Sequence, residues 1–133
     1  MHRISVLSVV LAACLISAVA IAAKDKASAT FEPLSASGIS GSADLLSMQQ
    51  GETKVHASLR GLTPGTEYVS RVYKGNQTCA TGGETIEAAR FVANPAGIVT
   101  FNAKVPVGLS DIGSISIQLA SDDALQACAS VTP

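Results

Sequence analysis

Residues 53–79, TKVHASLRGLTPGTEYVSRVYKGNQTC, form the stretch that decides the fold of this chain. In its first eight residues, the apolar side chains of Val55, Ala57 and Leu59 alternate with polar ones. This alternation is typical of a strand with one buried face. The GLTPG segment that follows supplies a turn, because proline fixes φ and glycine can take a positive φ. A second strand over 66–74 completes an expected β-hairpin.

Six further strands are expected outside this stretch, and turn residues separate them about every ten positions. No segment shows a convincing helical period. The expected strands, including the two of the hairpin, span 30–34, 39–48, 53–60, 66–74, 88–93, 99–105, 114–119 and 127–131. The strand at 114–119 should be half-buried, with Ile and Leu facing inward and Ser and Gln outward. This spacing predicts an all-β chain, an eight-stranded antiparallel sandwich or barrel.

The first 23 residues have the composition of a secretory signal. A basic start, MHR, precedes an apolar run at 4–23 that ends in small residues. We expect cleavage near Ala22 or Ala23, and a secreted or periplasmic product without a membrane span. Two alternatives remain open: the LAAC segment resembles a lipobox, which would place a lipid anchor on Cys14, and the run could be retained as a membrane anchor.

The remaining residues are enough for one small domain. We expect a flexible lead-in at 24–29 and a β-sandwich domain at 30–133. Beyond the signal, eight Lys and Arg face ten Asp and Glu, so no basic excess indicates nucleic acid. Cleavage would leave two cysteines, Cys79 and Cys128. An even pair in an exported small domain favours a disulfide, and the alternative is two free buried thiols.

The order of elements resembles the Cu/Zn superoxide dismutase family. The segment GETKVHASLRGLTPG matches that family's third strand and following turn, and the glycine spacing over 61–75 resembles its copper-binding strand. Cys79 falls near the family's loop cysteine, and ALQACASV at 124–131 resembles the last strand, with its partner cysteine. The resemblance implies an immunoglobulin-like Greek-key sandwich of eight strands with a disulfide between Cys79 and Cys128.

The family's metal site is not carried over by this resemblance. Ser70 and Val72 stand where the family has its His-x-His copper ligands, and no His or Asp cluster follows Cys79. The loop before the last strand is reduced to residues 121–124. Dismutation needs a redox metal held by several imidazoles, and only His56 remains after signal cleavage. We therefore expect no catalytic, cofactor-binding or metal-binding residues, and no enzyme activity.

Two weaker resemblances also lead to a β-sandwich. The segment GLTPGTEY at 61–68 resembles fibronectin type III modules, without their tryptophan, and the chain also resembles the chordin-type repeat without its histidines. The leading hypothesis is an exported, metal-free, non-catalytic binding or structural module with an unidentified protein or envelope partner. The alternatives are a copper- or zinc-dependent dismutase relative or copper carrier that completes its site with a partner, and a fibronectin-like adhesion module. Homodimerisation is left open.

Four sets of side chains are candidate sites. His56 is expected to face outward, and with Met48 it could form a soft copper site, although each residue has an ordinary structural explanation. The acidic pair at 122–123 could face a cation, but a solvated turn is favoured. The segment Asn-Gln-Thr at 76–78 fits the N-glycosylation pattern. Ser70 and Arg71 are interpreted as polar groups on the sheet surface.

Overall fold

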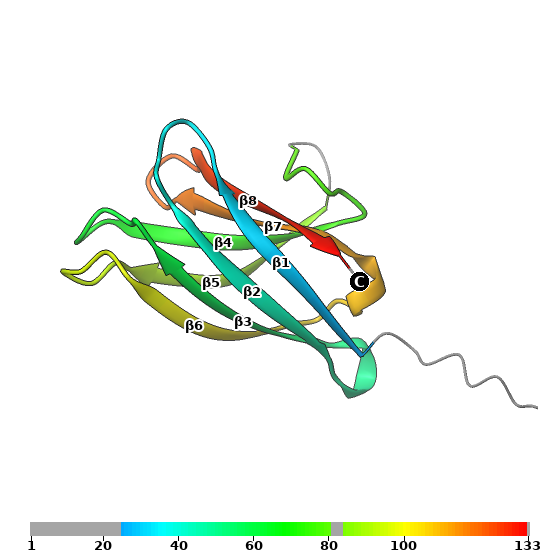
Figure 1. Cartoon of the computed structure of the whole chain (residues 1–133). Coiled ribbons are helices and arrows are strands. Elements are labelled where there is room, and N and C mark those ends of the chain that lie inside the picture. Colours follow the sequence, from blue (N-terminus) through cyan, green and yellow to red (C-terminus); the bar gives the residue numbers. More distant parts are fainter. Residues whose placement is uncertain (1–24, 81–83, 133) are drawn as a thin grey trace, which may run out of the picture.

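The computed structural model describes residues 25–80 and 84–132 (Figure 1). Over these residues the chain forms eight antiparallel strands and two short 3-10 turns, Gln49–Gly51 and Leu109–Asp111. The strands are β1 Lys26–Pro33, β2 Ser40–Ser47, β3 Thr53–Arg60, β4 Glu67–Lys74, β5 Thr85–Val92, β6 Val99–Val105, β7 Ile112–Leu119 and β8 Leu125–Thr132. The prediction of an all-β, eight-stranded antiparallel fold is confirmed.

The predictions for the N-terminal segment lie outside the described residues. They are the secretory signal at 1–23, its cleavage near Ala22 or Ala23, and the lipid anchor on Cys14. Within the part of the chain that the structure describes, no helix has the length and apolar character needed to cross a membrane.

The strands follow the order β5-β4-β7-β8-β1-β2-β3-β6 in one nearly closed sheet. In Figure 1, β1, β2, β3 and β6 form the near half, and β4, β5, β7 and β8 lie behind them. Pairing of β1 with β8 joins the two halves. The chain passes between the halves at the β3–β4, β5–β6 and β6–β7 connections, which gives the Greek-key arrangement that the resemblance implies.

The prediction of a β-hairpin over 53–74 is wrong. Both strands form, but β3 pairs with β2 and β6, whereas β4 pairs with β5 and β7. Their connection crosses one end of the sheet with Leu62 buried beneath it. The backbone N–H groups of Leu62 and Gly65 donate to the carbonyls of Gly97 and Ala93, which belong to the β5–β6 connection. Turn residues predict a reversal of the chain, but they do not determine which strands pair.

The interior is built from the inward side chains of both halves, and no tryptophan contributes to it. On β3, Val55, Ala57 and Leu59 are buried as the alternation predicts. Near the edge between β5 and β6, which are not neighbours in the sheet, Phe91 stacks on Phe101 with ring centroids 5.4 Å apart. This aromatic contact packs the two end strands against each other where no strand ladder joins them.

The prediction of a flexible lead-in over 24–29 is wrong from Lys26 onward. Strand β1 begins at Lys26, and Ala27 and Ala29 are buried. The segment KASATFE alternates small apolar and polar residues, so it has strand period, but alanine alone gives a weak apolar signal. Pairing with β2 on one side and β8 on the other supplies the order that the local sequence does not indicate.

Strand β7 also differs from expectation, because both of its faces are buried. Ser114, Ser116 and Gln118 were expected to face solvent, yet none of these side chains is exposed. The chain after β4 folds over this outer surface. Ser114 Oγ accepts a hydrogen bond from Cys79 N–H at 3.1 Å and donates one to the carbonyl of Asn76. The segment after β4 therefore covers the side of β7 that was expected to face solvent.

The predicted disulfide is confirmed. Cys79 and Cys128 are bonded, with their Cα atoms 6.0 Å apart, within the range that a disulfide requires. The bond joins the segment after β4 to strand β8 across the outer surface of β7, because Cys128 lies opposite Ser116 in the β7–β8 ladder. It therefore fastens the covering segment to the sheet.

Candidate functional site

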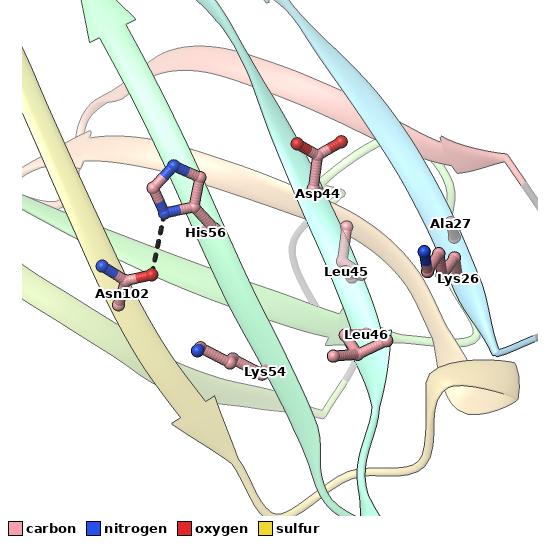
Figure 2. Close-up of a pocket in the computed structure, with 8 residues that line it drawn as sticks. All are labelled: Lys26, Ala27, Asp44, Leu45, Leu46, Lys54, His56 and Asn102. Atoms are coloured by element: carbon pink, nitrogen blue, oxygen red, sulfur yellow. Dashed lines mark hydrogen bonds between the residues drawn. The ribbon is translucent and has the colours of Figure 1, made fainter.

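The outward side chains of β1, β2, β3 and β6 form a continuous surface that we call the polar face. Each of these strands alternates buried residues with exposed ones, so one side of the four-stranded half is solvated. Its members are Lys26, Ser28, Thr30, Glu32, Ser40, Ser42, Asp44, Leu46, Lys54, His56, Ser58, Arg60, Thr100, Asn102 and Lys104. One end of this face contains a groove of about 500 Å³, whose lining is drawn in Figure 2.

The register of the four strands arranges these side chains in rows across the sheet. The first row consists of Lys26, Leu46, Lys54 and Lys104. The second row consists of Ser28, Asp44, His56 and Asn102, and the third of Thr30, Ser42, Ser58 and Thr100. Neighbouring strands are about 4.8 Å apart, so three lysines of the first row lie within roughly 15 Å of one another.

Within the first row, Lys54 and Lys104 are direct cross-strand partners. Like charges directly opposite each other destabilise a sheet. Neither lysine forms an ion pair with any described carboxylate, and the same is true of Lys26 and Arg60. The polar face therefore carries four cationic groups without carboxylate partners.

The other Lys and Arg residues of the described part of the chain are all paired. Arg90 contacts both Glu67 and Glu87. Its hydrogen bond to Glu87, and to a smaller extent the one to Glu67, raises the pKa of its guanidinium above the ordinary value. The remaining pairs are Arg71 with Asp123 at 3.1 Å and Lys74 with Glu84 at 3.2 Å. Charge is thus distributed unevenly: the formal net charge of the chain is −1, yet its unpaired cations gather on one face.

His56 lies at the centre of the second row and faces outward, as predicted. Its Nδ1 is 2.8 Å from Oδ1 of Asn102, and Figure 2 shows the two side chains turned toward each other. An amide oxygen can only accept, so Nδ1 is the donor in this contact. The contact fixes the orientation of the imidazole on the face.

The proposed pairing of His56 with Met48 is not formed. In the β2–β3 ladder His56 lies opposite Asp44, and Met48 is four positions further along the chain, beyond the end of β2. At about 3.3 Å per residue, this separation is roughly 13 Å, too far for one metal ion to bridge. Among the residues that the structure describes, no group of three or more His, Cys, Asp or Glu side chains could hold a metal.

The interpretation of Ser70 as a surface residue is wrong. Ser70 is fully buried, on the same side of β4 as Tyr68 and Val72 and opposite Ile117 of β7. Its hydroxyl has no hydrogen-bond partner among the described residues. Ser70 and Val72 therefore do not fit a copper site, because neither has an imidazole and both are packed in the core. Arg71 is on the outer surface, where it pairs with Asp123.

The two remaining sequence candidates lie in turns. The Asp122 carboxylate accepts a hydrogen bond from the Ala124 N–H, and Asp123 is paired with Arg71, so both acids have structural partners. Asn76 Oδ1 accepts hydrogen bonds from the N–H and hydroxyl of Thr78, which closes a local turn. Such turns are typical of asparagine in loops.

The sequence interpretation missed most of the polar face. Lys26, Asp44, Asn102 and Lys104 were not selected, because they lie on different strands and form no local motif. The available signal was the polar half of each strand's alternation, which becomes a surface only once strand order is known. The arrangement offers four cationic groups together with hydroxyl and amide groups for binding, and it also carries the carboxylates of Glu32 and Asp44. Comparison with protein-family models and with curated proteins finds no match.

Proposed function

We propose that this chain is an exported, non-catalytic module of superoxide dismutase-like fold that binds an anionic ligand on the polar face. One observation carries the proposal. Lys26, Lys54, Arg60 and Lys104 have no carboxylate partner, while every other described Lys and Arg has one. A surface evolved only for solubility would be expected to intersperse its charges, as the rest of this molecule does.

The energetics favour a ligand with several charges. A single exposed ion pair contributes about 0.2–1 kcal/mol, so one carboxylate on one lysine would bind too weakly to matter. A ligand that contacts the whole first row would add several such terms and would relieve the repulsion between Lys54 and Lys104. Because these groups are exposed, the binding should be sensitive to salt.

The assignment to a dismutase-like module is supported by the nearly closed sheet of eight antiparallel strands and by the disulfide. The proposal that the module is non-catalytic rests on Ser70 and Val72. They occupy the expected ligand positions, are buried and lack metal-binding groups. Export, and a secreted or periplasmic location, rest on the composition of residues 1–23.

The first test removes charge from the first row. We expect the double variant Lys54→Gln/Lys104→Gln to bind polyacrylate, a simple carboxylate polymer, about tenfold more weakly than the unaltered chain at low salt. Titration calorimetry measures the change. Lys74→Gln/Arg90→Gln is the matched control, because it also removes two charges, from residues that lie off the face and are paired with carboxylates. Equal affinity of the double variant and the control would refute the proposal.

The second test concerns the rival copper carrier. We expect the purified chain to contain no stoichiometric copper or zinc and to consume superoxide no faster than free metal does, because the described residues offer His56 without a second imidazole. Elemental analysis and a superoxide assay provide the measurements. Copper bound one-to-one with micromolar or tighter affinity, and lost in His56→Ala, would favour the carrier instead.

A further inference from the structure

The cationic groups of the polar face lie at its two ends, and hydroxyl and amide groups, His56 and the carboxylate of Asp44 lie between them. The first row holds three lysines, and Arg60 lies six residues from Lys54 along β3, roughly 20 Å away. The Nε of Arg60 donates to Ser40 Oγ at 3.0 Å, which holds the guanidinium against the sheet. A ligand that contacts both ends must therefore be extended along the strands.

The middle of the face is a row of hydroxyl groups. Thr30, Ser42, Ser58 and Thr100 lie opposite one another in register, and all four are exposed. Next to them, on the side toward the lysines, are the side chains of Asp44, His56 and Asn102. Hydroxyl groups donate and accept, so this row can pair with a ligand that carries hydroxyls of its own.

A second hollow, of about 480 Å³, lies at the Arg60 end and is lined in part by Thr30, Ser42 and Ser58. Gly41 also lines it. A Cβ built on Gly41 would lie 2.1 Å from the Ser58 carbonyl oxygen, so the close approach of β2 and β3 requires glycine here. The face is thus hollowed at both ends, beside both sets of cations.

Building on the proposed function, we infer that the ligand is an acidic polysaccharide, a polymer of uronic acid type, lying along the strands of the polar face. Its carboxylates pair with the lysines and Arg60, and its ring hydroxyls pair with the hydroxyl row. This ligand supplies partners for both kinds of group. Along the strands, the face presents them in the order cation, hydroxyl, cation.

Two other classes of anionic macromolecule match the face less well. Single-stranded nucleic acid is bound by stacking of bases on aromatic side chains, and the outward residues of this face include no Phe, Tyr or Trp. A phospholipid surface is bound by apolar side chains inserted beside cations. The exposed apolar residues near the face, Leu46 and Ile98, lie at opposite ends of it and form no cluster.

The test compares polygalacturonate with polyacrylate, which has carboxylates but no hydroxyls. We expect the unaltered chain to bind both polymers, to bind polygalacturonate more tightly, and not to bind neutral dextran. The variant Ser58→Ala/Thr100→Val should bind polygalacturonate about fivefold more weakly and polyacrylate unchanged. Thr100→Ser, which keeps the hydroxyl, should bind polygalacturonate as the unaltered chain does. Thermal melting verifies that each variant is folded.

The outcomes separate this inference from the proposed function. If polyacrylate binding depends on Lys54 and Lys104 but the hydroxyl variant binds both polymers unchanged, the anion site stands and the polysaccharide assignment is overturned. Tighter binding to vesicles of phosphatidylglycerol than to polygalacturonate also overturns it, in favour of a membrane surface. If no polyanion binds, both the inference and the proposed function fail.

Discussion

Replacing Cys128 with serine should lower the midpoint of thermal unfolding by roughly 20 °C. The disulfide joins residues 49 positions apart, and closing a loop of this size stabilises a protein by roughly 4 kcal/mol in the chain-entropy model. A domain of this size has only about 5–15 kcal/mol of net stability, so the loss is a large share of the total. Calorimetry or circular dichroism of the purified domain measures it.

The structure adds a local reason for a large effect. Without the bond, the segment around Cys79 is held over β7 mainly by the hydrogen bonds of Ser114 and by that from Ser130 Oγ to the Gln77 carbonyl. Reductant should lower the midpoint of the unaltered chain to that of the variant and leave the variant unchanged. A fall of less than about 5 °C, or reductant acting equally on both proteins, would contradict the prediction.

Replacing Phe31 with alanine should destabilise the fold by about 3–5 kcal/mol. Phe31 is 1% exposed and lies on β1, the strand that joins the two halves of the sheet. Its cross-strand partners are Gly41 and Ala129, which are too small to fill the space that the ring leaves. The cavity should therefore persist, and we expect a value near the upper end of the range.

Denaturant unfolding measures this change as a lower midpoint at an unchanged slope, which shows that stability rather than compactness has changed. Phe31→Leu should cost less, because it keeps most of the apolar volume. Glu32→Gln, at the exposed neighbouring position, should change the free energy of unfolding by less than about 0.5 kcal/mol. Equal loss in Phe31→Ala and Phe31→Leu would show that the ring does not fill the core in this way.

Local pattern predicted the strands where large apolar residues alternate with polar ones. The segments around Val55 and Phe101 were expected with bounds that match β3 and β6. The pattern failed for the start of β1, where Ala27 and Ala29 are the inward residues, because a methyl side chain gives a weak apolar signal. Strand β1 is ordered by its two neighbours rather than by its own composition.

The polar face shows the limit of local pattern for the site. His56 was placed outward correctly, because its position in the alternation determines which way it points. Its neighbours Asp44 and Asn102 come from positions far away in the chain, and only strand order and register bring them beside it. The same holds for Lys26, Lys54 and Lys104, which make one row from three strands.

The sequence by itself therefore determined the all-β class and most of the strand positions, because these follow from period and turn residues, and it predicted the pairing of Cys79 with Cys128, because these are the two cysteines beyond the expected signal. The tertiary structure decided that β3 and β4 belong to different halves, that Ser70 faces the core, and that four unpaired cations share one surface. The physical reason is that side-chain period is a local property. Strand order and register depend on burial across the whole sheet, which joins residues that no local pattern connects.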